Sequence, residues 1–441
     1  MPEKTAGALA TFKFIVFSLF GLFMFFFKLE WLSPELKSFP LDFIINWLQL
    51  NFMPTIRILV LLAMYCGAII PFIKRTWNKS SLSIIMSFIK LLGAVLGTVF
   101  YFQLYQGSWL WRYDVAPFLF DGLAVYVCLI FPLGSMFLAF ATGYGLVEFC
   151  NVFFNRMMQF LLDLHTPYSI EVFAPFILKS SPANDFIDAL KAEEHSEREN
   201  DIILTGFLTV SITLILTMAK ALMLMDEWMS YFLVSVFVTF AVTGITARLW
   251  PLCMVPDAAY REAPIAGTVK TRLKCAWNTG INAASKQDKV LTLCAKSLWS
   301  GIKTASATIP SLIAVCLLGF WVAKFTPLFD CLGYLFYPFF RVFGISQPFL
   351  ASKAVAAGLS DMFLPAVLVR ESGTTLLKFV IAVVSISEVL FFSVSIPYIL
   401  ENKASLSLRE ILVIWFERVA LSILIALPIG LCLGFSDINI S

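Results

Sequence analysis

Charge is scarce in this sequence. Only 14% of the 441 residues are Asp, Glu, Lys or Arg, and only two are histidine. Soluble domains carry about 25% charged residues, whereas this chain is 59% hydrophobic. A soluble globular protein is therefore excluded. The net charge of +3 is too small to indicate a nucleic-acid partner, and we expect none.

The motifs of common enzymes and metal sites are also missing. The nine cysteines lie mostly in apolar segments without paired spacing, so we interpret them as free thiols. The sequence contains no Cys-x-x-Cys, no zinc-protease motif and no phosphate-binding loop. We therefore predict that the protein is not an enzyme and has no cofactor and no resident metal.

What the sequence has instead is a series of long apolar runs. A helix of about 20 apolar residues crosses the hydrocarbon core of a bilayer. The runs predict an all-α, polytopic membrane protein with about nine transmembrane helices. They cover residues 14–27, 56–73, 82–104, 119–142, 202–224, 231–249, 309–325, 376–400 and 411–433.

Basic residues set the expected orientation. Residues 74–79 hold three basic and no acidic residues, and residues 248–289 hold seven Lys or Arg against three Asp or Glu. Such loops stay in the cytoplasm. We expect a multi-pass protein of a bacterial-type inner (plasma) membrane, with its N-terminus cytoplasmic and its C-terminus outside. The second basic stretch shows no long periodic segment, which predicts a tethering loop, and residues 289–304 predict an amphipathic helix at the interface.

Two stretches, residues 168–198 and 349–371, break an apolar arm of about ten residues with a polar turn. Ten helical residues span roughly half of the hydrocarbon core, so each arm must turn back. Irregular backbone at that depth is tolerated only inside protein or beside a water-filled cavity. We predict two re-entrant helical hairpins that face a ligand site; two short interfacial helices are the alternative.

The chain also contains a weak internal repeat. Residues 153–167 align without a gap on 334–348, and residues 210–213 align on 384–387. Charge places the two hairpins on opposite sides, so the copies would be inverted. Inverted repeats with broken helices are typical of secondary transporters. Duplication in a scaffold that does not transport remains the alternative.

Three short motifs resemble a known family. They are Thr-Gly-Phe-Leu-Thr-Val-Ser at 205–211, Arg-Leu-Trp-Pro at 248–251 followed by Pro-Asp at 256–257, and Asp-Met-Phe-Leu-Pro-Ala at 361–366. Residues 118–400 resemble the YjiH-like bacterial inner-membrane proteins, which have nucleoside-recognition (Gate) domain repeats. That group is similar to parts of concentrative nucleoside transporters, ferrous-iron permeases and spore-maturation membrane proteins.

The resemblance implies a hairpin-bearing inverted repeat and names no substrate. The first hairpin departs from the glycine- and serine-rich family pattern, because Lys179 and Pro182 occupy its tip. The domain boundaries that follow are N-terminal helices at 1–117, a first Gate-type repeat at 118–250, a cytoplasmic loop and amphipathic helix at 251–305, a second Gate-type repeat at 306–400, and a C-terminal helix at 401–441.

Ionisable residues within spans are costly and call for a functional explanation. Glu388 lies in the middle of a predicted span, with hydroxyl residues beside it and at pseudo-symmetric positions. The alternative role for the hydroxyl residues is helix packing. The alternative role for Asp361 is to be neutralised by Lys353 across the second turn. The predicted substrate-binding set is Glu388, Ser385, Ser387, Thr209 and Ser211, with Lys179, Ser181, Ser360 and Asp361 at the hairpin tips.

These features together predict a secondary transporter or permease. It would move a small polar solute, nucleoside-like or another metabolite, by alternating access around the two hairpins, with H⁺ or Na⁺ as the coupling ion. Its partners would be the solute and the lipid bilayer. A homo-oligomer and a partner membrane subunit both stay open. The alternatives are a membrane scaffold or a subunit of a larger complex, and a divalent-cation permease.

Overall fold

The computed structural model describes residues 2–29, 38–78, 80–150, 152, 161–162, 196–256, 269–287, 289–401 and 406–435. The part of the chain that it describes is helical and contains no β-strand. The first predicted hairpin lies outside the described residues up to residue 195, which includes Lys179 and Ser181.

The described residues form helices throughout the chain. In the N-terminal half they are α1 (Pro2–Phe26), α2 (Pro40–Ile73), α3 (Ser81–Tyr101), α4 (Trp109–Arg112), α5 (Val115–Pro117), the π-helix η2 (Phe118–Ala124), α6 (Val125–Gly143), α10 (Glu197–Phe207), α11 (Ile212–Ala221) and α12 (Trp228–Thr246). In the C-terminal half they are η3 (Leu252–Met254), α13 (Val269–Lys286), α14 (Val290–Phe325), α15 (Leu328–Gly333), α16 (Tyr337–Val342), α17 (Pro348–Ala357), α18 (Leu364–Val369), α19 (Thr375–Ser387), α20 (Ser395–Glu401) and α21 (Leu408–Cys432).

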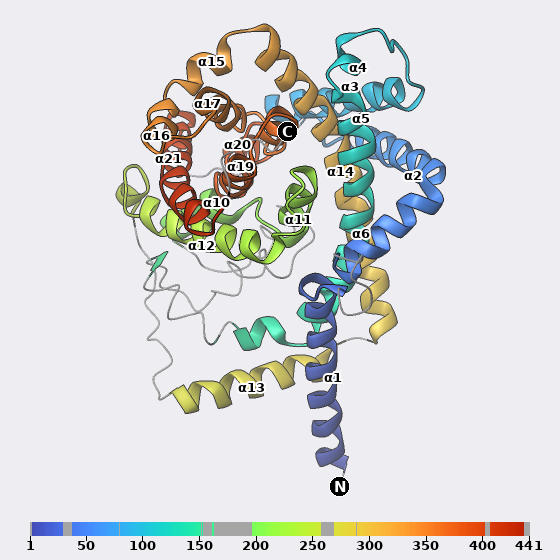
Figure 1. Cartoon of the computed structure of the whole chain (residues 1–441). Coiled ribbons are helices and arrows are strands. Elements are labelled where there is room, and N and C mark those ends of the chain that lie inside the picture. Colours follow the sequence, from blue (N-terminus) through green and yellow to red (C-terminus); the bar gives the residue numbers. More distant parts are fainter. Residues whose placement is uncertain are drawn as a thin grey trace.

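The helices form two groups that lie side by side (Figure 1). One group packs α2, α3 and α6 around α14, and the other gathers α10 to α12 with α17 to α21. Glycines allow the first group to pack closely: a Cβ on Gly67 of α2 would lie 1.7 Å from Ser306 O, and one on Gly93 of α3 would lie 1.8 Å from Pro310 O. Small residues at such crossings are typical of helices that associate in membranes.

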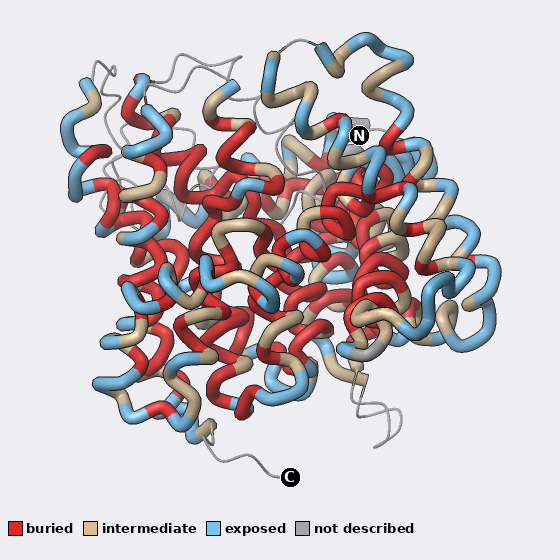
Figure 2. The backbone as a smooth tube through the Cα atoms, turned by 90° about the horizontal axis from the view of Figure 1, so that it is seen from above, coloured by how far each residue is buried: buried red, intermediate tan, exposed pale blue. Residues whose placement is uncertain are grey.

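The polytopic, all-α membrane fold is confirmed. Seven helical stretches of the described residues are long and apolar enough to span a membrane, and two of them, Val115–Gly143 and Glu197–Ala221, join neighbouring elements. Two shorter apolar helices cover Ala10–Phe26 and Thr375–Ser387. Buried residues gather in the interior of the bundle and exposed residues on its periphery (Figure 2). The outer surfaces of α2 and α3 expose apolar side chains such as Leu62 and Phe88, as expected where helices meet lipid.

Two predictions for the middle of the chain were wrong. Residues 248–289 are not a simple tether, because α13 forms an 18-residue helix there. The interfacial segment 289–304 is not separate from the next span either, since both belong to the continuous 36-residue helix α14. Pro310 lies inside α14 and did not end it, because packing against α2, α3 and α6 supports the helix on several sides.

Two hydrogen bonds join helix ends that the charge pattern predicts to lie on the same side of the membrane. Lys28 Nζ donates to Asp226 O at 2.8 Å, and both ends were expected outside. Ser80 Oγ donates to Glu401 Oε1 at 2.5 Å, and both ends were expected inside. The direction of the chain relative to the cytoplasm stays a prediction from the positive charges.

Candidate functional site

The span predicted over residues 202–224 is broken into α10 and α11. The helix ends at Phe207 and starts again after Ser211, whose hydroxyl accepts a hydrogen bond from Leu214 N at 3.3 Å. No proline or glycine lies in the break, which has the sequence Leu-Thr-Val-Ser. Its β-branched residues and the helix-capping serine favour the interruption locally.

The span predicted over residues 376–400 is broken in the same way. Helix α19 ends at Ser387, and α20 starts at Ser395, whose hydroxyl accepts from Phe391 N at 2.7 Å. Between them Val389 adopts a φ of 58°, a left-handed conformation that costs a β-branched residue on the order of 1–2 kcal/mol. Strained backbone of this kind persists where surrounding contacts hold it, often at functional sites.

The two breaks touch each other. The hydroxyl of Thr209 in the first break donates to Val389 O in the second at 3.2 Å. Both residues are buried. The irregular backbone of one broken helix is therefore stabilised in part by the other, and the polar groups of the two breaks share one interior region.

The stretch predicted to be the second hairpin forms two short helices, α17 and α18, joined by a buried turn. The turn backbone pairs with the second break: Phe392 N donates to Leu359 O at 2.8 Å, and Ser393 N donates to Ser360 O at 3.0 Å. Because these bonds satisfy main-chain groups that α19 leaves free, the hairpin tip and the break form one structural unit. Its position within a bilayer stays a prediction.

Asp361 stabilises the turn through its side chain. Its Oδ1 accepts from Phe363 N at 2.8 Å and from the Cys316 thiol of α14 at 3.1 Å. The alternative in which Lys353 neutralises Asp361 was wrong, because Lys353 Nζ pairs with Asp330 Oδ1 at 2.7 Å.

Glu388 lies between the second break and the hairpin tip. Its side chain is fully buried, and neither carboxylate oxygen has a hydrogen-bond partner among the residues that the structure describes. It lies against Gly358 of the turn, where an added Cβ would be 2.5 Å from Oε1 and 2.6 Å from Oε2. The charged groups Asp361 and Arg418 and the indole N–H of Trp415 act on it electrostatically. A buried carboxylate without a hydrogen bond is costly.

Arg418 of α21 is a site residue that the sequence reasoning missed. It is fully buried, and its Nε and Nη2 donate to Ser387 O at 3.0 and 2.6 Å. Nη2 also donates to Gly206 O at 3.4 Å, and Nη1 donates to Thr243 Oγ1 at 3.0 Å. A charged residue inside the apolar run 411–433 was the available signal, since the rule that selected Glu388 applies equally to an arginine.

The predicted site residues divide into two sets. Thr209, Glu388, Ser360 and Asp361 come together around the breaks and the hairpin tip, through the contacts described above. Ser211, Ser385 and Ser387 have different surroundings, and Lys179 and Ser181 lie outside the described residues. The hydroxyl of Ser387 contacts Ser422 of α21.

Ser211 bonds to Thr213 Oγ1 at 2.9 Å besides capping α11. Ser385 is buried within α19, before the break. The alignment of residues 210–213 with 384–387 therefore does not match equivalent positions, because Ser211 follows its break whereas Ser385 precedes its own.

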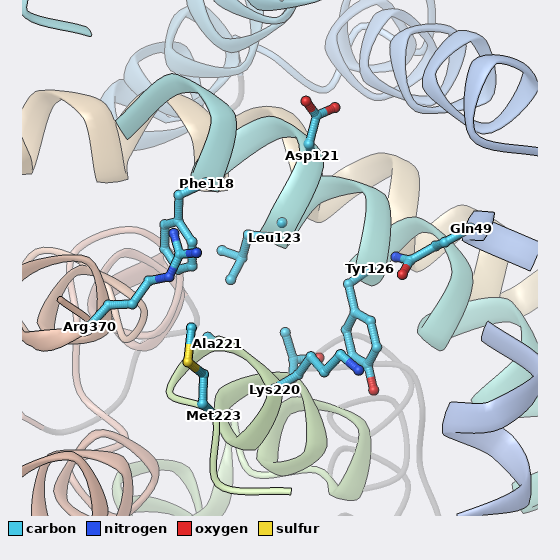
Figure 3. Close-up of a pocket in the computed structure, with 11 residues that line it drawn as sticks. Gln49, Phe118, Asp121, Leu123, Tyr126, Lys220, Ala221, Met223 and Arg370 are labelled. Atoms are coloured by element: carbon cyan, nitrogen blue, oxygen red, sulfur yellow. The ribbon is translucent and has the colours of Figure 1, made fainter. Parts of the chain in front are cut away.

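A separate cavity of about 180 Å³ lies between the two helix groups. Figure 3 shows Arg370 beside Phe118 at one end of it, and Lys220 of α11 beside Tyr126 toward the other. Lys220 pairs with Asp42 at 3.3 Å, and Arg370 pairs with Asp114 at 3.2 Å. Within the described ranges, no three His, Cys, Asp or Glu side chains are placed to hold a metal ion.

Comparison with known proteins supports the fold. No family model matches the chain. An uncharacterized protein of Alkalihalophilus pseudofirmus is 26% identical over 467 residues, which cover 97% of this chain and 95% of that protein.

Among solved structures, the chain is similar to CNTnw, a concentrative nucleoside transporter, in an inward-facing, substrate-bound state. The TM-score is 0.50 and the identity 15%, over 84% of this chain and 91% of that one. A variant of CNTnw in an outward-facing state has a TM-score of 0.49 and 15% identity, over 96% and 99% of the two chains. The protein thus has a polytopic membrane fold similar to that of a transporter.

Proposed function

We propose that the protein is a secondary transporter or permease that moves a small polar solute by alternating access. The observation that carries this proposal is the unpaired carboxylate of Glu388, fully buried where a break in one helix meets the tip of a hairpin. Leaving a charge buried without a partner costs several kcal/mol. A site of this kind is expected to find its partner in a bound solute or coupling ion.

The surrounding geometry suits such a ligand. Broken helices place free backbone groups and hydroxyls in the interior of transporters, where they bind substrate and coupling ions. Here the two breaks meet through Thr209 and Val389, and the turn holding Ser360 and Asp361 lies beside them. We assign the solute and its coupling ion, H⁺ or Na⁺, to this region, with Glu388 as the principal binding group.

The finer features of the proposal follow from the sequence. They are a YjiH-like protein with Gate-type inverted repeats, re-entrant hairpins on opposite sides, a cytoplasmic N-terminus in the inner membrane, and a nucleoside-like or other metabolite as solute. The similarity to CNTnw supports the overall fold at 15% identity. The paired breaks in α10–α11 and α19–α20 support a repeat of helix architecture. Self-association or a partner membrane subunit is compatible with this proposal.

The proposal is tested in two steps. Purified protein is first screened by thermal shift against a metabolite library, with and without Na⁺, since a ligand that binds the folded state raises the unfolding midpoint. Uptake of the resulting hit into proteoliposomes is then compared for wild type, Glu388→Gln and Glu371→Gln. Glu371 is an exposed carboxylate at the other end of the same hairpin, so its variant serves as the control.

Loss of a charge-assisted hydrogen bond costs about 1.5–3 kcal/mol, or roughly 10- to 100-fold in affinity. We expect Glu388→Gln to lose that much in uptake at low solute concentration, and Glu371→Gln to lose nothing. Unchanged uptake in Glu388→Gln would contradict the assignment. No thermal shift with any metabolite, together with a stoichiometric co-purifying membrane protein, would favour a scaffold instead.

A further inference from the structure

The guanidinium of Arg418 binds two carbonyl groups that the helix breaks set free. In a continuous helix, Ser387 O would accept from Phe391 N, but that N–H donates to the Ser395 hydroxyl instead. Gly206 O would accept from Val210 N, which donates to Phe207 O at 3.1 Å. Both carbonyls lie at the C-terminal ends of the first half-helices, α19 and α10.

These ends are natural cation sites. The C-terminus of a helix carries roughly half a negative charge from its aligned peptide dipoles. In transporters with broken helices, freed carbonyls and the C-terminal ends of half-helices are the groups that coordinate Na⁺. The two acceptors here come from different broken helices, and one cationic side chain reaches both, at 2.6 Å for Ser387 O and 3.4 Å for Gly206 O.

The local packing is built around this arginine. A Cβ on Gly206 would lie 2.5 Å from Thr243 Cγ2, so glycine allows Thr243 to approach and accept from Arg418 Nη1. On α21, Ser422 Oγ donates to Arg418 O at 2.6 Å and contacts the Ser387 hydroxyl. Helix α21 is therefore attached to the end of α19 through both the carbonyl and the hydroxyl of one residue.

We propose that Arg418 is a built-in cation that takes the place of a coupling Na⁺ at the C-terminal ends of α10 and α19. A Na⁺ ion would have to compete with a covalently attached guanidinium for the same carbonyl oxygens and would be repelled by its charge. The two breaks are then held together without a bound metal cation. Of the two coupling ions named in the proposed function, this inference selects H⁺, so neither stability nor transport depends on Na⁺. The transport part of this inference rests on the proposed function.

The first experiment measures thermal unfolding of the full-length protein in detergent with NaCl, KCl or choline chloride. The wild-type midpoint is expected to be the same in all three salts. A midpoint that rises saturably with Na⁺ but not with K⁺ or choline would overturn the inference. This measurement needs no transported solute, so its outcome is independent of whether the proposed function is correct.

The second experiment asks whether a free cation can replace the side chain. Arg418→Ala removes the guanidinium and leaves space for a small cation, so its midpoint is expected to fall and to recover by at least half when millimolar guanidinium chloride is added. Arg409→Ala is the matched control, because Arg409 is exposed near the start of the same helix and should show no recovery. A purely structural role for Arg418 predicts a loss that guanidinium does not restore, and this result would contradict the proposal.

Arg418→Lys provides a second variant in case the alanine variant does not fold. A lysine carries the charge but cannot reach several acceptors in the planar geometry of a guanidinium, so its midpoint should lie between those of wild type and Arg418→Ala. If neither variant can be purified, the wild-type salt series decides. Once a solute is known, wild-type uptake should agree within a factor of two between Na⁺ and choline, and a strict Na⁺ requirement would refute the inference.

Discussion

Gly358 provides the most direct test of the arrangement around Glu388. It lies in the turn between α17 and α18, and a Cβ added to it would be 2.5 Å from Glu388 Oε1 and 2.6 Å from Oε2. Ordinary contact distances between nonbonded atoms are about 3.5 Å. The substitution Gly358→Ala therefore requires the carboxylate or the turn to move by about 1 Å in a region that is fully buried.

The expected cost of this displacement is moderate. Adding one methyl group to a well-packed interior typically costs about 1–3 kcal/mol, and the turn is held on its other side by the bonds from Phe392 N and Ser393 N. The free-energy cost to uptake should exceed the cost to unfolding stability, because the methyl group displaces the Glu388 carboxylate, which is the proposed binding group. A shift of about 1 Å in a positioned group can cost roughly 100-fold in activity.

A double-mutant cycle separates this contact from other effects. Thermal and denaturant unfolding would be measured for Gly358→Ala, Glu388→Ala and the double variant. Removing the carboxylate makes room for the methyl group, so the alanine at 358 should cost less than about 0.5 kcal/mol in the Glu388→Ala background. Gly107→Ala is the control, since nothing lies within 4 Å of an added Cβ there. Equal costs of Gly358→Ala in both backgrounds would show that the carboxylate does not lie on the glycine.

Two further substitutions test a buried ion pair beside the separate cavity and the second helix break. Asp42 is 1% exposed and accepts from Lys220 Nζ at 3.3 Å and from the Tyr126 hydroxyl at 3.2 Å. Because the lysine is partly exposed, we expect Asp42→Asn to lower the free energy of unfolding by about 1–2 kcal/mol, measured as a lower unfolding midpoint. Ser395→Ala removes the cap on Phe391 N and should cost about 1 kcal/mol. Hydrogen exchange of residues 388–394 should accelerate in that variant, and unchanged exchange would show that the serine does not hold the segment.

The architecture was largely predictable because hydropathy reports helix length and burial directly. The two short helices α17 and α18, joined by the turn that holds Asp361, correspond to a polar turn between two apolar arms in the sequence. Glu388 was selected because a carboxylate within a span is costly. In each case one local property of the sequence corresponds to one structural requirement.

The helix breaks could not be predicted in this way. Both occur inside apolar segments that lack proline and glycine at the break, so hydropathy treats them as continuous spans. The interruption depends on partners far along the chain, since Val389 O is bound by Thr209 and Phe392 N by Leu359 O. The only local signal was a serine after each break, Ser211 and Ser395, where each helix restarts.

The site can be understood from the hydrogen bonds that the breaks make necessary. Ending α19 at Ser387 frees a carbonyl, which Arg418 binds, and frees the N–H groups that Ser395, Leu359 O and Ser360 O accept. Buried backbone groups almost always find such partners. Of the two carboxylates at this junction, Asp361 accepts hydrogen bonds, whereas neither oxygen of Glu388 does. A junction that holds several freed backbone groups in place and leaves one buried carboxylate without a hydrogen bond is prepared to receive a ligand, and this imbalance is the physical basis for proposing that the solute binds there.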